Sequence, residues 1–235
     1  MQQAIEAFRE SASRAEHLGG LYKALSGLTT AAVDASDLLR AQVVLAVSAL
    51  DFYVHEITVR GMVEVFEGRR RQTEAFLKYR VSVGSVALGM STQSSSWFES
   101  EVRERHSYLS FQQPDKVADA IRLFSDAILW REVALLMATS ERNVKDQLKL
   151  IIDRRNKIAH DGTISTRAIL TLGGPLSPQT LNSQFTSCVL FAKAFIQLLS
   201  RSEPDENWVR APENLGRSQS STSRYDLVVP DRIIA

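Results

Sequence analysis

Apolar residues recur at the three- and four-residue spacing of amphipathic helices along most of the chain, whereas strand-like alternation is scarce. The most apolar stretch, at about residues 35–66, predicts a helix that belongs in a core. The pattern therefore predicts an all-α helical bundle with further helices added to it. The expected helices span residues 2–26, 35–66, 97–109, 126–138, 143–159 and 178–199, with another start at 114 and a short helix or turn at 69–80.

Several of these helices carry residues that commonly begin or end a helix. Ser36 or Asp37 is expected to cap the start of the most apolar helix, and Gly68 to end it. Gly162 is expected to stop the penultimate helix, since a glycine just past the last turn tolerates the backbone conformation found there. Ser177 or Pro178 is expected to open the last helix.

The composition changes near the C-terminal end of the sequence. From residue 204 onward the chain is rich in Pro, Asn, Arg and Ser, and residues 218–223 are nearly all Ser or Thr. Such a segment has too few apolar residues to build a core of its own. We therefore expect one helical domain over residues 1–203 and a loosely structured C-terminal extension over residues 204–235.

Composition limits the class of protein before any motif is considered. The chain is 44% apolar and 23% charged, as in ordinary soluble domains. Its single cysteine, Cys188, excludes an intramolecular disulfide and a cysteine-based zinc site, which fits a reducing cytosol. The longest apolar stretch, residues 41–54, is interrupted by Ser48 and Asp51, and no secretion signal is visible. We expect a cytoplasmic protein without a membrane span.

The charges nearly balance, which bears on nucleic-acid binding. Lys and Arg number 28 against 27 Asp and Glu, a net charge of +1. A segment that holds nucleic acid by charge alone is strongly basic, so the composition argues against that mode of binding.

Residues 153–162, Asp-Arg-Arg-Asn-Lys-Ile-Ala-His-Asp-Gly, place ionisable groups near the end of a predicted helix. Asn156 and His160 lie one turn apart and share a face if the helix extends that far. Arg155 instead falls on the apolar side of the helix, where an arginine needs an acidic partner, a phosphate or a cleft. That apolar side is formed by Leu148, Ile152 and Ala159.

A second polar cluster interrupts the most apolar helix. Asp51 and His55 are one turn apart, so the carboxylate can orient the imidazole or pair with Arg155 from across the bundle. They can equally form an internal pair that fixes the helix in place. For His55 we favour the structural role, because no nucleophile or metal ligand accompanies it, and for Asp51 both roles stay open.

These segments together resemble the HEPN superfamily, in its RiboL-PSP-HEPN branch. The Arg-x4-His spacing of Arg155 and His160 at a helix end is one part of the resemblance. The other parts follow in the same order along the chain. They are residues 44–56 (VLAVSALDFYVHE), 110–123 (SFQQPDKVADAIRL), the Leu-Trp at 129–130, and 143–161.

The resemblance implies a helical bundle that dimerises so that two Arg/His motifs meet in one cleft. It also implies endoribonuclease activity without metal or cofactor, as in HEPN toxins and phage-defence effectors, so an antitoxin or operon partner is a possible second component. By position, Arg155 and His160 match the catalytic pair and Asn156 the polar residue beside the arginine. Supporting positions are Arg154, Asp51 and His55.

These residue types suit RNA cleavage because RNA carries its own nucleophile, the 2′-hydroxyl. A histidine with a pKa of ~6.5 exchanges a proton near neutral pH, and an arginine stabilises the charge that builds on the phosphate. Because Arg155 and His160 fall on different helix faces, either His160 lies past the helix end or a partner protomer supplies the second half. The alternatives are a non-catalytic HEPN module that binds RNA, nucleotides or a protein, and a purely structural helical adaptor.

Overall fold

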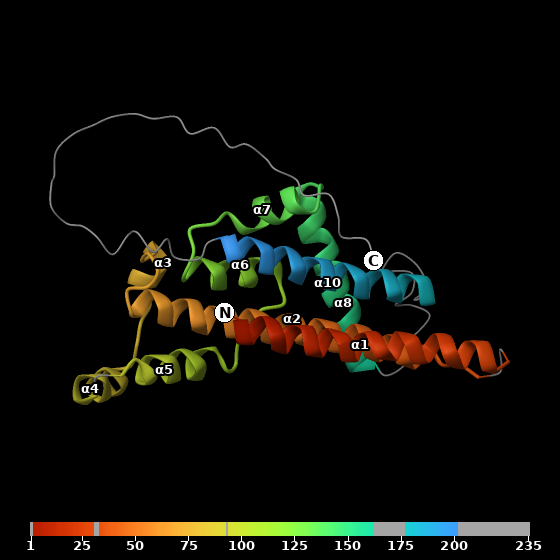
Figure 1. Cartoon of the computed structure of the whole chain (residues 1–235), viewed down its shortest axis with the longest axis horizontal. Coiled ribbons are helices and arrows are strands. Elements are labelled where there is room, and N and C mark those ends of the chain that lie inside the picture. Colours follow the sequence, from red (N-terminus) through yellow and green to blue (C-terminus); the bar gives the residue numbers. More distant parts are fainter. Residues whose placement is uncertain (1, 31–32, 93, 162–176, 202–235) are drawn as a thin grey trace. The chain divides into compact units, whose positions relative to one another are not determined.

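The computed structural model describes residues 2–30, 33–92, 94–161 and 177–201, with the side chains of residues 160, 161, 200 and 201 left out (Figure 1). Within these ranges the regular secondary structure is entirely α-helical, which confirms the predicted all-α fold. The helices are α1 (Gln2–Leu28), α2 (Ser36–Phe66), α3 (Glu74–Leu77), α4 (Val83–Ser91), α5 (Ser96–His106), α6 (Pro114–Arg122), α7 (Leu129–Leu136), α8 (Glu141–Asp161) and α10 (Pro178–Arg201).

Helix α2 is the central element of the bundle, and α1, α5, α6, α8 and α10 all pack against it. Its length and hydropathy would also suit a membrane span, and among the described residues it is the one helix that meets this test. Half of that apolar stretch is buried inside the bundle. The apolar character of α2 is therefore accounted for by its place in the core.

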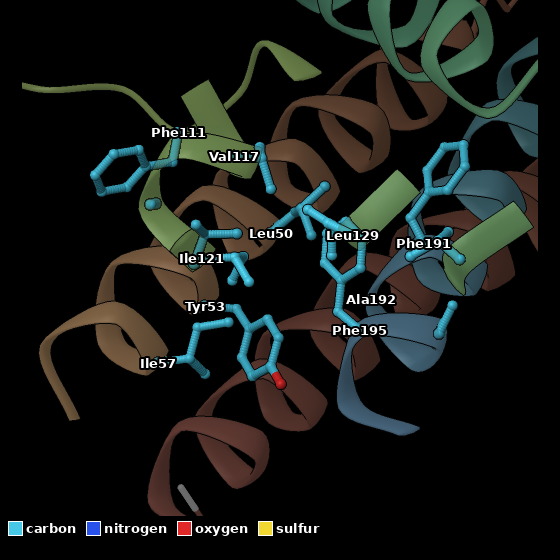
Figure 2. Packing of buried hydrophobic residues seen from close by; sticks show 14 of the residues in the cluster. Leu50, Tyr53, Ile57, Phe111, Val117, Ile121, Leu129, Phe191, Ala192 and Phe195 are labelled. Atoms are coloured by element: carbon cyan, nitrogen blue, oxygen red, sulfur yellow. The ribbon is translucent and has the colours of Figure 1, made fainter. Parts of the chain in front are cut away.

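The main core forms where α2 meets α6, α7, α8 and α10. Figure 2 shows Leu50, Tyr53 and Ile57 of α2 packed among side chains from α6 and α10, and all three are at most 1% exposed. Phe191 and Phe195 of α10 are fully buried in the same cluster. The core thus joins segments from both ends of the described chain and holds α8 against α2.

Two of the four capping predictions are confirmed, one is wrong, and the fourth, for Gly162, lies outside the described residues. Gly68 adopts a φ of +73° just after α2, a conformation that favours glycine, and it ends the helix as predicted. The Ser177 hydroxyl accepts a hydrogen bond from the backbone N–H of Thr180 at 3.2 Å, which confirms it as a cap of α10. Ser36 and Asp37 as caps were wrong: both lie inside α2, and Ala35 occupies the N-cap position without a side-chain hydrogen bond.

Helix α4 was missed by the sequence analysis because it is short and apolar, with no polar face to reveal a helical period. Its start is held by Glu101 of α5, which is 5% exposed. This carboxylate accepts hydrogen bonds from the Ser82 N–H at 2.8 Å and the Ser85 hydroxyl at 2.6 Å. Hydrogen bonds from Ser85 and Arg105 lower the pKa of Glu101 to about 2, so the anchor stays ionised.

Other boundaries shifted by a few residues. Helix α5 ends at His106 and not near 109, and α7 begins at Leu129 and not near 126. The predicted extension, residues 204–235, lies outside the described residues, so the division of the chain at residue 203 stays a prediction.

Gly61 of α2 allows a close approach between the central helix and Phe124. A Cβ atom at this position would lie 2.3 Å from the Phe124 ring, and that ring is 1% exposed. We expect Gly61→Ala to lower the free energy of unfolding by about 1–3 kcal/mol, because overpacking a tight core forces neighbours to move. Urea denaturation measures the change.

Gly20→Ala is the matched control, because Gly20 is also helical and a Cβ there would meet nothing within 4 Å. The better helix propensity of alanine should leave stability unchanged or raise it by up to about 1 kcal/mol. Equal stability of the two variants would contradict the packing account.

Candidate functional site

The Arg-Arg-Asn-Lys-Ile-Ala-His motif occupies the last turns of α8, which continues through Asp161. Asn156 and His160 therefore lie one turn apart on a single helix, as the spacing predicted if the helix extended that far. The alternative in which His160 lies past the helix end is wrong. The side chain of His160 lies outside the described part of the structure.

Arg155 lies where the apolar side of α8 leaves the core. Leu148 and Ile152, on the same side, are at most 1% exposed, whereas Ala159 one turn later is exposed and Arg155 itself is half-buried. The buried part of the stripe therefore ends beside Arg155.

The Arg155 guanidinium is held by a neutral neighbour. Its Nη1 donates a hydrogen bond to Oδ1 of Asn156 at 3.1 Å. Its Nε is buried without a hydrogen bond, and no carboxylate of the described residues lies within ion-pair distance of it. A cation in this state can bind an anion without first giving up an acidic partner.

Arg154, the preceding residue, lies in a different environment. It is 5% exposed and faces α10, where Gln184 is also 5% exposed. With the amide oxygen of Gln184 turned toward it, Gln184 accepts hydrogen bonds from Nε of Arg154 at 3.1 Å and from Nη1. Burial lowers the pKa of the Arg154 guanidinium below its ordinary value. The contacts of Arg154 therefore join α8 to α10, and no surface on Arg154 is open to an RNA phosphate.

The motif end of α8 lies beside the first turns of α2. Ile158 packs against Leu39 and Val43 of α2 and against Leu181 of α10. Asp51 lies further along α2, about 12 Å from Val43 along the helix axis at 1.5 Å per residue. The structure therefore groups Arg155 and Asn156 at one end of α2 and leaves Asp51 and His55 as a separate cluster.

Asp51 anchors the segment that precedes α6. Its Oδ1 accepts a hydrogen bond from the Phe111 N–H at 2.7 Å, and its Oδ2 accepts one from Nε2 of Gln112 at 3.2 Å. Nε2 of His55 lies 3.9 Å from the same carboxylate, and the His55 ring packs on Phe111 with 4.5 Å between centroids. The described contacts of Asp51 thus fix tertiary structure, and the hypothesis that it pairs with Arg155 finds no contact to support it.

A second histidine of this cluster was missed by the sequence analysis. His106 is 5% exposed and packs edge-on against Phe111 and Tyr79, at centroid distances of 5.5 and 6.0 Å. Burial, together with the electrostatic effect of the neighbouring His55 and Arg105, lowers the pKa of His106 to about 4. It is therefore neutral at neutral pH and belongs to the packing around Phe111. No spacing in the sequence connects it to Asp51 or His55.

A pocket of about 530 Å³ opens between α3, α6, α7 and the start of α8, and none of the predicted site residues lines it. Its charged lining residues include Glu74 with Lys78 and Glu141 with Lys145, which are paired with each other. Among the described residues, no group of three or more His, Cys, Asp and Glu side chains is placed to hold a metal ion.

The fold and the motif define a class of protein, an all-α bundle with a basic Arg-Asn-x3-His motif at the end of a core helix. The RiboL-PSP-HEPN family model matches residues 9–201, so the chain belongs to that family. No curated protein and no solved structure matches the chain. Membership is compatible with a ribonuclease or a nucleotide-binding module, so the choice between them depends on the chemistry of the motif.

The contacts of Asp51 predict a structural effect when its carboxylate is removed. Asp51→Ala leaves the Phe111 N–H without its acceptor, so we expect the free energy of unfolding to fall by about 1–3 kcal/mol. Asp146→Ala is the matched control, because that carboxylate is 66% exposed and pairs with Arg142 at 3.5 Å, an exposed contact worth less than about 1 kcal/mol. Urea denaturation of both variants measures the difference, and equal stabilities would refute the anchoring role.

Proposed function

We propose that the protein is a metal-independent endoribonuclease of HEPN type, acting in the cytoplasm as a toxin or phage-defence effector. The observation that carries the proposal is the state of Arg155. Its guanidinium lies at the surface end of an apolar stripe, is positioned by Asn156, and has no carboxylate partner among the described residues. A structural arginine is usually neutralised by a carboxylate, whereas a phosphate-binding arginine keeps its charge available.

The proposed reaction needs a proton carrier and a charge stabiliser. The 2′-oxygen of a ribose attacks the adjacent phosphorus, the P–O5′ bond breaks, and the products are a 2′,3′-cyclic phosphate and a 5′-hydroxyl. His160 exchanges the protons, taking one from the 2′-hydroxyl or giving one to the leaving 5′-oxygen. Arg155 donates hydrogen bonds to the phosphate oxygens as negative charge builds, with Asn156 holding its orientation.

The helix geometry supports a site shared between two protomers. Positions 155 and 160 project from one continuous helix about 140° apart, at about 100° per residue. With the helix continuing through Asp161, one way for an arginine and a histidine to face the same phosphate is to take one from each copy. We therefore propose a homodimer in which the two motif ends form one basic cleft, and an antitoxin or operon partner would act on this assembly.

The second candidate is a non-catalytic HEPN module that binds RNA, a nucleotide or a partner protein. An available, half-buried Arg155 would serve phosphate binding as well as it serves catalysis. The role of His160 distinguishes the two functions, because binding a phosphate needs the arginine while transferring protons needs the histidine.

RNA cleavage in excess EDTA tests the catalytic function. We expect the wild type to cut single-stranded RNA and leave 2′,3′-cyclic phosphate ends, and His160→Ala to lose at least about 100-fold in rate, a typical loss when an acid–base group is removed. His17→Ala is the control, because His17 is an exposed histidine on α1 that is not part of the motif. A wild type that cuts nothing, or a His160→Ala variant that cuts equally well, would remove the catalytic assignment.

Substitutions of the two neighbouring arginines are expected to have different effects on turnover and on stability. Arg155→Ala should lower kcat by about 100-fold or more with little change in stability, since it removes a group that stabilises transition-state charge. Arg154→Ala should have the smaller effect on turnover and should lower the free energy of unfolding, because Arg154 is 5% exposed and bonded to Gln184. Single-turnover cleavage measures the rate and urea denaturation measures the free energy of unfolding of each variant. Arg142→Ala is the control, because the Arg142 side chain is 90% exposed. A larger loss of turnover in Arg154→Ala than in Arg155→Ala would mean that Arg154 is the catalytic arginine.

A further inference from the structure

Helix α2 carries an arginine, Arg40, that shares an unusual feature with Arg155. The Nε atoms of these two arginines are buried and, among the described residues, have no hydrogen-bond partner. Folded chains rarely leave a buried N–H group without an acceptor, because the group gives up its hydrogen bond to water and gains none in return. Each of the two guanidinium groups therefore gains if an additional acceptor is bound beside it.

Arg40 lies at the end of α2 that meets the motif. Leu39, the residue before it, packs in one cluster with Ile158 of α8. Ile158 follows Arg155 by less than one helical turn. Figure 1 shows α8 passing across α2, and the two helices are in contact. The two arginines therefore come from neighbouring turns of two packed helices.

The contacts of α2 also indicate that Arg40 is on the side where α8 packs. Gln42 lies about 160° around α2 from Arg40, and it lies against Gly19 of α1, where a Cβ atom would be 2.8 Å from Nε2 of Gln42. Leu39 and Val43 lie between these two positions around the helix. Helix α10 packs on α1, α2 and α8, so it lies between α1 and α8. Arg40, on the far side of Leu39 and Val43 from α1, therefore lies on the α8 side.

The ion pair that Arg40 makes within the chain is an exposed one. Its guanidinium pairs with Asp37, three residues earlier, and the Asp37 side chain is 86% exposed whereas that of Arg40 is 31% exposed. Pairs with a solvated carboxylate contribute little to stability, because water competes for both groups. Asp37 can turn to solvent while the half-buried arginine stays in place, so the pair leaves Arg40 able to bind another anion.

We propose that Arg40 is a second RNA-binding residue of this site and holds a backbone phosphate next to the one that is cut. The inference rests on the proposed function, since it concerns the substrate of the same site. A guanidinium that is already partly desolvated and held by its packing loses little freedom when it binds a phosphate. A single RNA strand would then be held from two helices, by Arg155 of α8 and Arg40 of α2.

The two arginines would act at different stages of the reaction. Arg155 binds the phosphate whose charge grows during cleavage, so its contribution is largest in the transition state. A neighbouring phosphate keeps the same charge throughout, so Arg40 would bind the substrate and the transition state equally well. Such uniform binding lowers KM and leaves kcat unchanged.

Binding of an uncleavable RNA at different salt concentrations tests the contact. The probe is a single-stranded 2′-O-methyl oligonucleotide, which has no free 2′-hydroxyl to attack the phosphate. Arg40→Gln should raise its Kd at least about fivefold at low salt. Between about 50 and 200 mM salt, the dependence of log Kd on log salt should become less steep by about 0.7, the value for one phosphate contact on a single strand. Arg40→Lys keeps the charge and should keep most of that steepness.

Arg122→Gln is the matched control. Arg122 pairs with Asp119 at the same three-residue spacing, but both of these side chains are more than 60% exposed. It should bind the oligonucleotide as the wild type does. Urea denaturation of the same variants identifies a role in folding alone: a less stable Arg40→Gln variant with an unchanged salt dependence would overturn the proposal.

Cleavage kinetics of the full chain test the division between the two arginines. Arg40→Gln should raise KM at least about fivefold and keep kcat within about threefold of the wild type, whereas Arg155→Ala should lower kcat. A loss confined to kcat in Arg40→Gln would contradict binding to a neighbouring phosphate.

The two assays separate this inference from the proposed function. A chain that cuts RNA, but whose Arg40→Gln variant binds RNA as Arg122→Gln does, would keep the ribonuclease and remove the role of Arg40. A chain that cuts no RNA, but whose RNA binding weakens with a less steep salt dependence in Arg40→Gln, would remove the ribonuclease and keep Arg40 as a phosphate contact. A wild type that binds no RNA would overturn the role of Arg40 whatever the cleavage assay shows.

Discussion

The burial of α2 is the constraint on which the rest of the structure depends. A helix of 31 residues that is apolar on several faces must be covered on each of them, and the chain covers it with α1, α5, α6, α8 and α10. The packing of α8 and α10 on α2 also places the motif, because Ile158 contacts both helices at Leu39, Val43 and Leu181. Three large apolar side chains of α2 nevertheless stay exposed, Leu45 at 44%, Phe52 at 49% and Phe66 at 42%.

The rotation of the α-helix gives two adjacent arginines different chemistry. Arg154 points toward α10, where Gln184 satisfies it in a nearly dry environment, while Arg155 lies where the apolar side of α8 reaches the surface. The first arginine therefore joins α8 to α10, and the second donates a hydrogen bond to Asn156 where the buried stripe ends. The resemblance gives Arg154 a supporting position at the site, but this side chain is turned into the protein. A chain with a net charge of +1 can still present a local basic site, because Arg155 has no carboxylate partner among the described residues.

For Asp51, a polar residue on an apolar helix, the sequence predicted that a partner exists but not which residue it is. The sequence indicated that this carboxylate needed a partner, because an isolated buried charge is costly. It could not indicate which partner, and the hydrogen bonds go to Phe111 and Gln112, about sixty residues further along the chain. The family resemblance placed Asp51 near the site, whereas its contacts place it in the packing of the segment before α6. The helix α4 and the buried His106 were not found for a related reason, since neither has a periodic or paired signal in its own neighbourhood.

The sequence by itself determined most of the helices and the position of the motif near the end of α8, because helical periodicity is a local property of a few neighbouring residues. Its Arg-x4-His pattern also indicated the family that the match over residues 9–201 then showed. The tertiary structure decided which of the two arginines is buried, where the carboxylate of Asp51 bonds, and which side chains of α2 stay exposed. Those outcomes depend on contacts between residues far apart in the chain, where burial and hydrogen bonding are set by how whole helices pack.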